Sequence, residues 1–302
     1  VFRAIPNCDV VGIVSRGGKS AQNLASEFAV PSFGTDWRHL ARKTNANACV
    51  VAVSHDMSEL VCREIIDAGF HVLAEKPVAL SSAEIFELAE RAQQRSVVAI
   101  AAVNRRFYPG ITEAVDALKM LGDIFHVSIN APDNPESRRI EGKHAGFVCD
   151  NWIRMNTIHA VDLLRMIGGE VTEMFGFRRV QVRPDHQTIS VCLRFECGIL
   201  GSFVLPGGLN TPWELRMAGE DAEVIAKPLE KVQLKIGNSN SKPLPSNPNN
   251  SASAFKLGLF EQAHAFVDAV HQGIVSWPCS DFADHAKTMK LIEEIEQLPS
   301  IT

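Results

Sequence analysis

Lys76 stands where a strand-like run ends, between Glu75 and Pro77. In an open α/β sheet, ligands bind beyond the carboxyl ends of the strands. A lysine at this place can donate a hydrogen bond to a hydroxyl and stabilise a developing alkoxide. Pro77 fixes the backbone immediately afterwards. The alternative is a surface lysine in a loop, and the tripeptide alone does not separate the two.

His159 and Asp162 form a second candidate pair. They are three residues apart within the helical pattern Trp152–Ile167, so both side chains lie on one face of the helix. An imidazole exchanges protons with a hydroxyl near neutral pH. A histidine capped by its neighbours is the structural alternative. Asp162 either holds the helix in place or binds a substrate hydroxyl.

The first third of the chain alternates apolar strand signals with amphipathic helices, which indicates βαβ units and a parallel sheet covered on both faces. Ser81 and Glu84 form a capping box at the start of a helix that runs to about Gln94. The predicted strands are Asp9–Val14, Cys49–Val53, His71–Ala74 and Val97–Val103, and the other predicted helices are Ser20–Phe28 and Ser58–Ala68.

The pattern changes after residue 105. Helices are predicted at Pro109–Leu121, Trp152–Ile167, Phe255–Gln272 and Phe282–Gln297, with a polar loop at Ala131–Gly146. Turn residues separate a series of strand signals, which predicts an open, mostly antiparallel sheet. These strands are Gly122–Ile129, Val171–Val182, Thr188–Phe195, Gly198–Leu205, Glu214–Ala218 and Glu223–Ala226.

Composition excludes several classes of protein. The net charge of -5 argues against a nucleic-acid partner or an anionic membrane surface. The seven cysteines form no CxxC pair, which favours reduced thiols in a cytoplasmic protein over a disulfide framework or a metal site. The longest apolar run, Val97–Val103, is far too short to span a membrane.

A dinucleotide-binding domain needs a first strand followed by a glycine-rich turn that receives the pyrophosphate. The chain contains no G-x-G-x-x-G, and Val1–Ile5 reads as the tail of a first helix. We therefore expect the first, central strand and its glycine loop to lie upstream of Val1, where a targeting segment could also lie.

Several motifs resemble the glucose–fructose oxidoreductase, inositol dehydrogenase and rhizopine-catabolism (Gfo/Idh/MocA) family. The stretch Asp67–Pro77 is similar to the signature of that family at almost every position. Val103–Phe107 resembles its next motif, Ile158–Leu164 its His-x-x-Asp helix, and Phe266–Val270 with Gly273 its closing helices.

The resemblance implies a Rossmann domain over residues 1–105 and an α+β domain for substrate binding and oligomerisation over residues 106–302. It implies a nicotinamide cofactor, NADP or NAD, and hydride transfer at a carbinol or keto carbon of a sugar, sugar derivative or cyclitol. Pairing through the open sheet would give a homodimer or homotetramer.

The resemblance also assigns roles to individual residues. Lys76, His159 and Asn156 are the expected catalytic set. Asn156 is included because the family commonly has an aspartate at the position that Met155 occupies in this chain. A thioether cannot orient an imidazolium, whereas Asn156, three residues before His159, can orient the ring. Asp150 near the helix start is a further candidate. A non-catalytic cofactor- or sugar-binding homologue is the alternative function.

The remaining expectations concern ligand contacts. Ser15 and Arg16 favour NADP(H), because an arginine accommodates a 2′-phosphate where an acid would bind the ribose of NAD. Arg106 is expected either to bind an acidic substrate group or to form a structural ion pair. The other expected cofactor contacts are Ser54, His55, Glu75, Lys76, Pro77 and Asn104, and the other expected substrate contacts are Asp162, Arg154 and Trp152.

Overall fold

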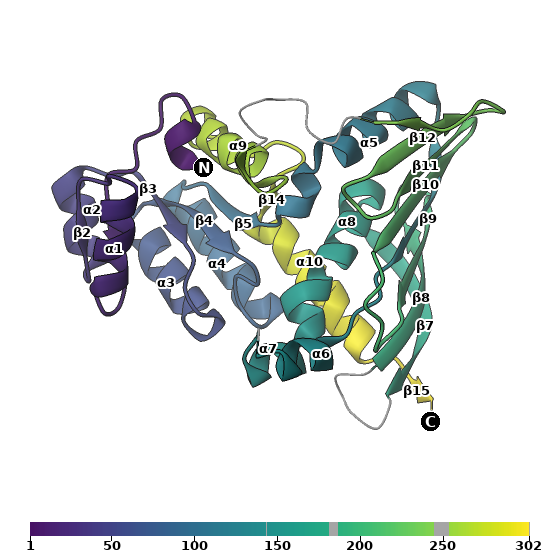
Figure 1. Ribbon diagram of the computed structural model, residues 1–302, viewed down its shortest axis with the longest axis horizontal. Helices are drawn as coiled ribbons and strands as arrows, with labels where there is room; N and C mark the ends of the chain where they lie inside the picture. Colours follow the sequence, from purple (N-terminus) through teal and green to yellow (C-terminus); the bar gives the residue numbers. More distant parts are fainter. Residues whose placement is uncertain (143, 181–186, 245–253, 302) are drawn as a thin grey trace.

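The computed structural model describes residues 1–142, 144–180, 187–244 and 254–301. A parallel sheet with helices packed on it leads into a large, open mixed sheet, as Figure 1 shows. This confirms the predicted fold class. The division at residue 105 stays a prediction, because strand β14 (Ser280–Asp281) from the far end of the chain pairs with the first sheet.

The first sheet has the strand order β14-β5-β4-β3. Its parallel strands are β3 (Ala48–Val51), β4 (His71–Glu75) and β5 (Ala99–Ala102), and the helices between them are α3 (His55–Asp67) and α4 (Ser82–Arg95). The predicted capping box opens α4: Ser81 Oγ accepts from Glu84 N at 3.3 Å, and Glu84 Oε2 accepts from Ser81 N at 3.1 Å.

Strands β1 (Ile13–Val14) and β2 (Phe33–Gly34) form a separate two-stranded parallel sheet. Helices α1 (Lys19–Glu27) and α2 (Trp37–Thr44) accompany it, and Phe2–Ala4 is a short 3-10 helix. Within the described ranges no ladder joins β1 to β3.

The second sheet has nine strands in the order β13-β12-β11-β10-β6-β9-β8-β7-β15. Its pairs are antiparallel except for β6–β9 and β7–β15. The last two residues of the predicted strand Val171–Val182 lie outside the described residues. The strands are β6 (Ile124–Asn130), β7 (Val171–Val180), β8 (Gln187–Phe195), β9 (Leu200–Leu205), β10 (Glu214–Gly219), β11 (Ala222–Ala226), β12 (Val232–Ile236), β13 (Lys242–Pro243) and β15 (Ser300–Ile301).

Helices cover one face of this sheet (Figure 1). Helices α5 (Pro109–Leu121) and α8 (Ile158–Gly168) contact its strands, and α10 (Phe282–Glu296) packs against both α8 and α4. Helix α9 (Leu259–Gln272) lies beside the first sheet (Figure 1). Large apolar side chains are exposed on the strand faces that the helices do not cover, and they include Phe125, Phe175, Phe177 and Leu200.

The predicted polar loop Ala131–Gly146 contains a short helix, α6 (Pro135–Ile140), and a second one, α7 (Gly146–Asp150), begins at its end. The predicted helix Trp152–Ile167 begins with a turn of π-helix, Ile153–Thr157, which precedes α8. Asn134 caps α6 by accepting from Ser137 N at 3.0 Å. Within the described ranges no helix is long and apolar enough to cross a bilayer.

Candidate active site

Three polar residues follow three neighbouring parallel strands. Ser54 comes after β3, Lys76 immediately after β4, and Asn104 after β5. The ladder pairs Val51 with Ala74 and Glu75 with Ala102, so these strand ends meet at one edge. This is the edge at which doubly wound sheets bind their ligands. Asn104 is held in place because its Nδ2 donates to Leu257 O at 3.1 Å.

Lys76 points from this edge toward the start of α8. Its ammonium donates a hydrogen bond to the backbone carbonyl of Met155. Burial lowers the pKa of Lys76 to about 8, against the opposing influence of Glu75. Glu75 itself is exposed, and Pro77 is buried behind the strand. A lysine with this pKa can both donate and accept a proton near neutral pH.

His159 lies in the first turn of α8 and is buried, with 5% of its surface exposed. Its Nδ1 has no hydrogen-bond partner among the described residues. Burial, together with the nearby positive charges of Lys76 and Arg105, holds the pKa of His159 well below its usual range. The imidazole is therefore neutral at pH 7, and one ring nitrogen can accept a hydrogen bond.

Arg106 and Asp162 form a buried ion pair with each other. Arg106 Nε and Nη2 each donate to a carboxylate oxygen of Asp162 at 2.7 Å, and Nη2 also lies 2.7 Å from Asp284 Oδ2. Both side chains are almost fully buried. Of the two alternatives left open by the sequence, this geometry supports the structural one for both residues: they join the β5 strand end to α8 and α10.

Arg154 is also engaged by the protein. Its Nη2 lies 2.5 Å from Glu296 Oε2, and Nη1 donates to Leu80 O. Arg154 thus ties the start of α8 to α10 and to the loop after β4. Asp150 pairs with Arg139 at 2.7 Å, so it does not supply a carboxylate to His159.

Asp133 is a site residue that the sequence did not reveal. It follows β6, and its Oδ2 accepts from Asn156 Nδ2 at 2.9 Å and from Thr157 Oγ1 at 3.4 Å. Burial raises its pKa, while hydrogen bonds and Arg105 act in the opposite direction. No short spacing links Asp133 to Asn156, which is 23 residues away, so no sequence motif could have marked it.

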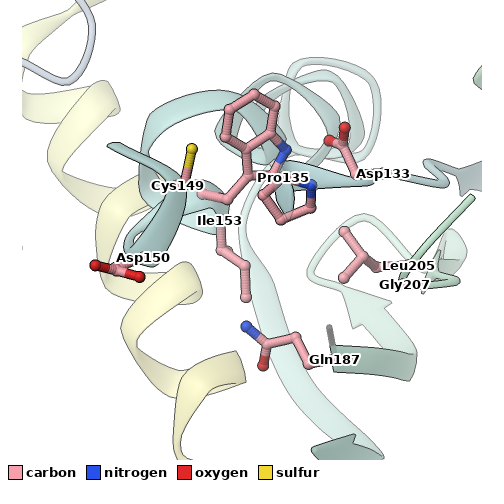
Figure 2. A pocket seen from close by; sticks show the side chains of 9 residues that line it. Asp133, Pro135, Cys149, Asp150, Ile153, Gln187, Leu205 and Gly207 are labelled. Atoms are coloured by element: carbon pink, nitrogen blue, oxygen red, sulfur yellow. The ribbon is translucent and has the colours of Figure 1, made fainter. Parts of the chain in front are cut away.

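A cavity of about 360 Å³ opens beside these residues. Its polar wall includes Arg105, Asp133 and Asn156, and its aromatic wall includes Trp152 and Trp213. The Arg105 guanidinium lies 3.9 Å from the centre of the Trp213 ring. A smaller pocket adjoins it, and Figure 2 shows Asp133 and Asp150 on opposite sides of that pocket.

The residues expected near the adenosine end lie at the ends of β1 and β3. Ser15 Oγ accepts from Ala21 N at 3.1 Å, and Arg16 is exposed. His55 stacks on Phe147 of α7, with ring centres 4.4 Å apart. The pKa of Asp56 is lowered, first by the Ser54 hydroxyl and more weakly by the charge of Arg16, so Ser54 and Arg16 border the same edge. Polar groups therefore follow β1, β3, β4 and β5, an arrangement that fits a dinucleotide laid along these strand ends.

The site unites a lysine of lowered pKa, a neutral histidine and a carboxylate of raised pKa. Burial moves the pKa of Lys76 downward and that of Asp133 upward, both toward neutrality, and such groups are suited to moving a hydroxyl proton. Among the described residues no group of histidine, cysteine, aspartate or glutamate side chains could hold a metal ion.

Comparison with known proteins agrees with this arrangement. Residues 1–103 match the model of an oxidoreductase family with an NAD-binding Rossmann fold, the Gfo/Idh/MocA family. The match covers the dinucleotide-binding part of the chain and does not extend to the nine-stranded sheet. Together with relatives named as dehydrogenases, it supports a nicotinamide dinucleotide cofactor and an NAD(P)-dependent oxidoreductase that acts on CH–OH groups.

Relatives extend the similarity over the whole chain. Trans-1,2-dihydrobenzene-1,2-diol dehydrogenase from Sus scrofa is 23% identical over 315 residues, which cover 100% of this chain and 92% of the relative. A dehydrogenase structure from Chromobacterium violaceum has a TM-score of 0.82 at 17% identity, covering 96% of this chain and 87% of that one. A structure of levoglucosan dehydrogenase in complex with NADH has a TM-score of 0.77 at 18% identity, with coverage of 96% and 87%. At these identities the solved structures establish the shared fold.

Proposed function

We propose that this protein transfers a hydride between a nicotinamide cofactor and a carbinol or keto carbon of a sugar, sugar derivative or cyclitol. The observation that carries the proposal is the meeting of Lys76 with the start of α8, beside His159 and next to a cavity lined by polar and aromatic side chains. A ring with several hydroxyls suits such a cavity, because its apolar face packs on aromatic rings while its hydroxyls bind polar groups.

Two relatives support the choice of substrate class. One is named for a cyclic diol, and the other for levoglucosan, with NADH bound. Both names describe ring compounds that carry hydroxyl groups.

The bound nicotinamide would accept or supply the hydride, and the residues of this chain would handle the proton. In the direction of oxidation, the substrate hydroxyl donates to Lys76 in its neutral form, and the Lys76 amine takes the proton as the C–O bond gains carbonyl character. His159, neutral and buried, would use its unpartnered Nδ1 to hydrogen-bond the same hydroxyl. In the reverse direction the Lys76 ammonium returns the proton to the alkoxide.

Ser54, His55, Glu75, Pro77 and Asn104 would border the cofactor at the strand ends, and we propose NADP(H) as the preferred form. Arg16 supports this preference, because it is exposed just beyond β1, where a 2′-phosphate would meet its guanidinium. The open sheet with its exposed Phe125, Phe175, Phe177 and Leu200 supports a homodimer or homotetramer that covers this apolar face.

A non-catalytic homologue is the second candidate, because the side chain at position 155 is a buried thioether that cannot ionise. Turnover separates the two. The protein, expressed with whatever sequence precedes Val1 in its gene, would be mixed with NADP⁺ or NAD⁺ and a panel of cyclitols and sugars. Reduced cofactor would be followed by its absorbance.

For the enzyme, Lys76→Ala should lower kcat by about 10²- to 10⁴-fold, the usual contribution of a general acid–base group. Lys287→Ala is the matched control, since Lys287 pairs with Glu170 on the surface. Cofactor binding without turnover of any panel member would favour the non-catalytic homologue. An unchanged rate in Lys76→Ala would refute the assigned role.

A further inference from the structure

Arg105 borders the cavity of about 360 Å³ and forms no ion pair with any residue that the structure describes. Its guanidinium lies over the Trp213 ring, and its Nη1 is buried without a hydrogen-bond partner among those residues. Burial lowers the pKa of Arg105, and the opposing influences of Tyr108 and Glu230 do not offset it. A buried cation without a counter-charge is unfavourable, so an anion that enters the cavity would be bound strongly.

The carboxylates that line the same cavity, those of Asp133 and Glu230, already have donors. Asp133 Oδ2 accepts from Asn156 Nδ2 at 2.9 Å and from Thr157 Oγ1 at 3.4 Å. Burial raises the pKa of Tyr108, and the hydrogen bond between its hydroxyl and Glu230 acts in the same direction. The acceptors of the cavity wall are thus engaged within the protein, whereas the Arg105 donors are not.

Arg138 supplies a second cation to the cavity from helix α6. It is half-buried, and in the part of the chain that the structure describes it forms no ion pair. Its neighbour Arg139, by contrast, pairs with Glu136 at 3.3 Å and with Asp150 at 2.7 Å. A planar guanidinium with several donors suits a carboxylate or a phosphate group. Two such groups, from different elements, therefore border one cavity.

The position of Arg105 is fixed before any ligand arrives. Trp213 Nε1 donates to Pro132 O at 3.1 Å, which holds the ring in place. The Arg105 guanidinium lies 3.9 Å from the centre of that ring. Its main chain is held as well, because its carbonyl accepts from Tyr108 N at 3.3 Å. A cation that is ordered in advance loses little conformational entropy when it binds an anion.

The cavity extends away from the residues that would handle the hydroxyl proton. Lys76 and His159 do not line it, but Asn156 does. Asn156 follows Met155, whose carbonyl accepts from Lys76. A substrate whose reacting carbon lies at Lys76 would therefore place a remote substituent in the cavity.

We propose that this cavity binds an anionic substituent of the substrate, a carboxylate or a phosphate, and that Arg105 and Arg138 supply its counter-charges. The inference rests on the proposed oxidoreductase function and narrows its substrate to an acidic sugar derivative. A neutral ligand leaves the Arg105 guanidinium buried without a partner, so the site discriminates against it.

The test compares acids with uncharged analogues by calorimetric titration of the protein in its cofactor complex. The pairs are D-glucuronate and its methyl ester, D-gluconate and D-glucitol, and D-glucose 6-phosphate and D-glucose. In at least one pair the acid should bind about 10- to 100-fold more tightly, as expected for hydrogen bonds to a charged group. The pair with the largest ratio distinguishes a carboxylate from a phosphate. The absence of a preference in all three pairs would overturn the proposal.

Variants then test whether the two arginines carry the preference. Arg105→Gln and Arg138→Gln should each weaken binding of the preferred acid by about tenfold and leave that of its neutral analogue within about twofold. Arg105→Lys keeps the charge without the planar fork and should retain part of the preference. Arg194→Gln is the matched control, because Arg194 is exposed and pairs with Glu173 at 2.7 Å, so this variant should keep the full preference. An equal loss for acid and analogue in Arg105→Gln would indicate a structural role and overturn the proposal.

Failure of the proposed function gives a different result, because turnover is followed separately by the absorbance of the reduced cofactor. Tighter binding of an acid without turnover of any compound supports the anion subsite and contradicts hydride transfer. Turnover of neutral sugars by a protein that binds no acid more tightly than its analogue supports hydride transfer and overturns the subsite.

Discussion

Arg105 and Arg106 are adjacent in the sequence and lie in opposite environments. Arg106 is 3% exposed and paired with Asp162 and Asp284, and these carboxylates raise the pKa of its guanidinium against the effect of burial. Arg105 lies over Trp213 at the edge of the cavity, and burial lowers its pKa. The comparison shows that one short turn directs Arg106 into a network of ion pairs and Arg105 to the edge of the cavity.

The same contrast separates two regions of the molecule. In the network between α8 and α10, Arg165 donates to Asp284 and Thr288 at 2.9 Å and to Glu170 at 3.0 Å. Beside the cavity, by contrast, the charges that lower the pKa of His159 come chiefly from Lys76 and Arg105, both of them cationic. Charges that are paired with opposite charges hold α8 and α10 together. Positive charges without such partners shift the pKa values of the candidate catalytic groups.

The largest expected effect comes from disrupting the ion-pair network between α8 and α10. Arg106→Leu leaves Asp162 and Asp284 buried without their common partner, and it should lower the free energy of unfolding by about 3–5 kcal/mol. Arg105→Leu should cost about 1 kcal/mol, because it removes a cation–π contact at a partly open site. Urea denaturation measures both. Equal losses in the two variants would contradict the contrast between the two arginines.

The elements behind this contrast could be predicted where local signals are strong. Helix α5 was predicted with the bounds that the structure shows, Pro109–Leu121, because proline opens it and Gly122 closes it. The 131–146 segment was predicted as a loop, since the short helices α6 and α7 lack a sustained apolar stripe. Their formation depends on caps and ion pairs that periodicity does not record.

The site itself could be predicted only in part. Lys76 was recognisable because a strand end places it at the ligand-binding edge. The sequence left two roles open for Asp162, holding the helix or binding a substrate hydroxyl, because its partner Arg106 is 56 residues away and no spacing pattern reveals their ion pair. No sequence pattern marked Asp133 as a site residue, because the residues that hold it in place come from the β9–β10 loop and the start of α8. Such contacts depend on tertiary packing and leave no spacing pattern in the sequence.

A second prediction concerns stability at low pH. Each of the two regions contains one buried histidine, His159 beside the cavity and His285 in α10. Burial keeps the pKa of His159 well below 6.5 and lowers that of His285 to about 4. The unfolded chain therefore binds protons first as the pH falls. The contribution of the two neutral histidines to the free energy of unfolding is fully present above about pH 6.5. Below that pH the free energy of unfolding decreases by up to about 1.4 kcal/mol per pH unit for each histidine.

His285→Leu should remove about half of this dependence between pH 6.5 and 5, as measured by urea denaturation at a series of pH values. The wild-type protein, measured over the same pH series, provides the reference slope. A slope that His285→Leu does not alter would mean that protonation of His285 is not coupled to unfolding.

The smallest expected effect tests the pKa of Lys76 through catalysis. Because burial lowers this pKa to about 8, the neutral amine that accepts the hydroxyl proton becomes scarcer as the pH falls below 8. The rate of alcohol oxidation should therefore rise about tenfold per pH unit up to pH 8 and level off above it, while ketone reduction should decline above pH 8. Arg105→Gln removes one of the positive charges that lower this pKa, so it should move the midpoint of both profiles to higher pH. A midpoint that stays fixed in Arg105→Gln would show that the cations at the cavity do not tune Lys76, and the contrast between the two regions would then reduce to burial alone.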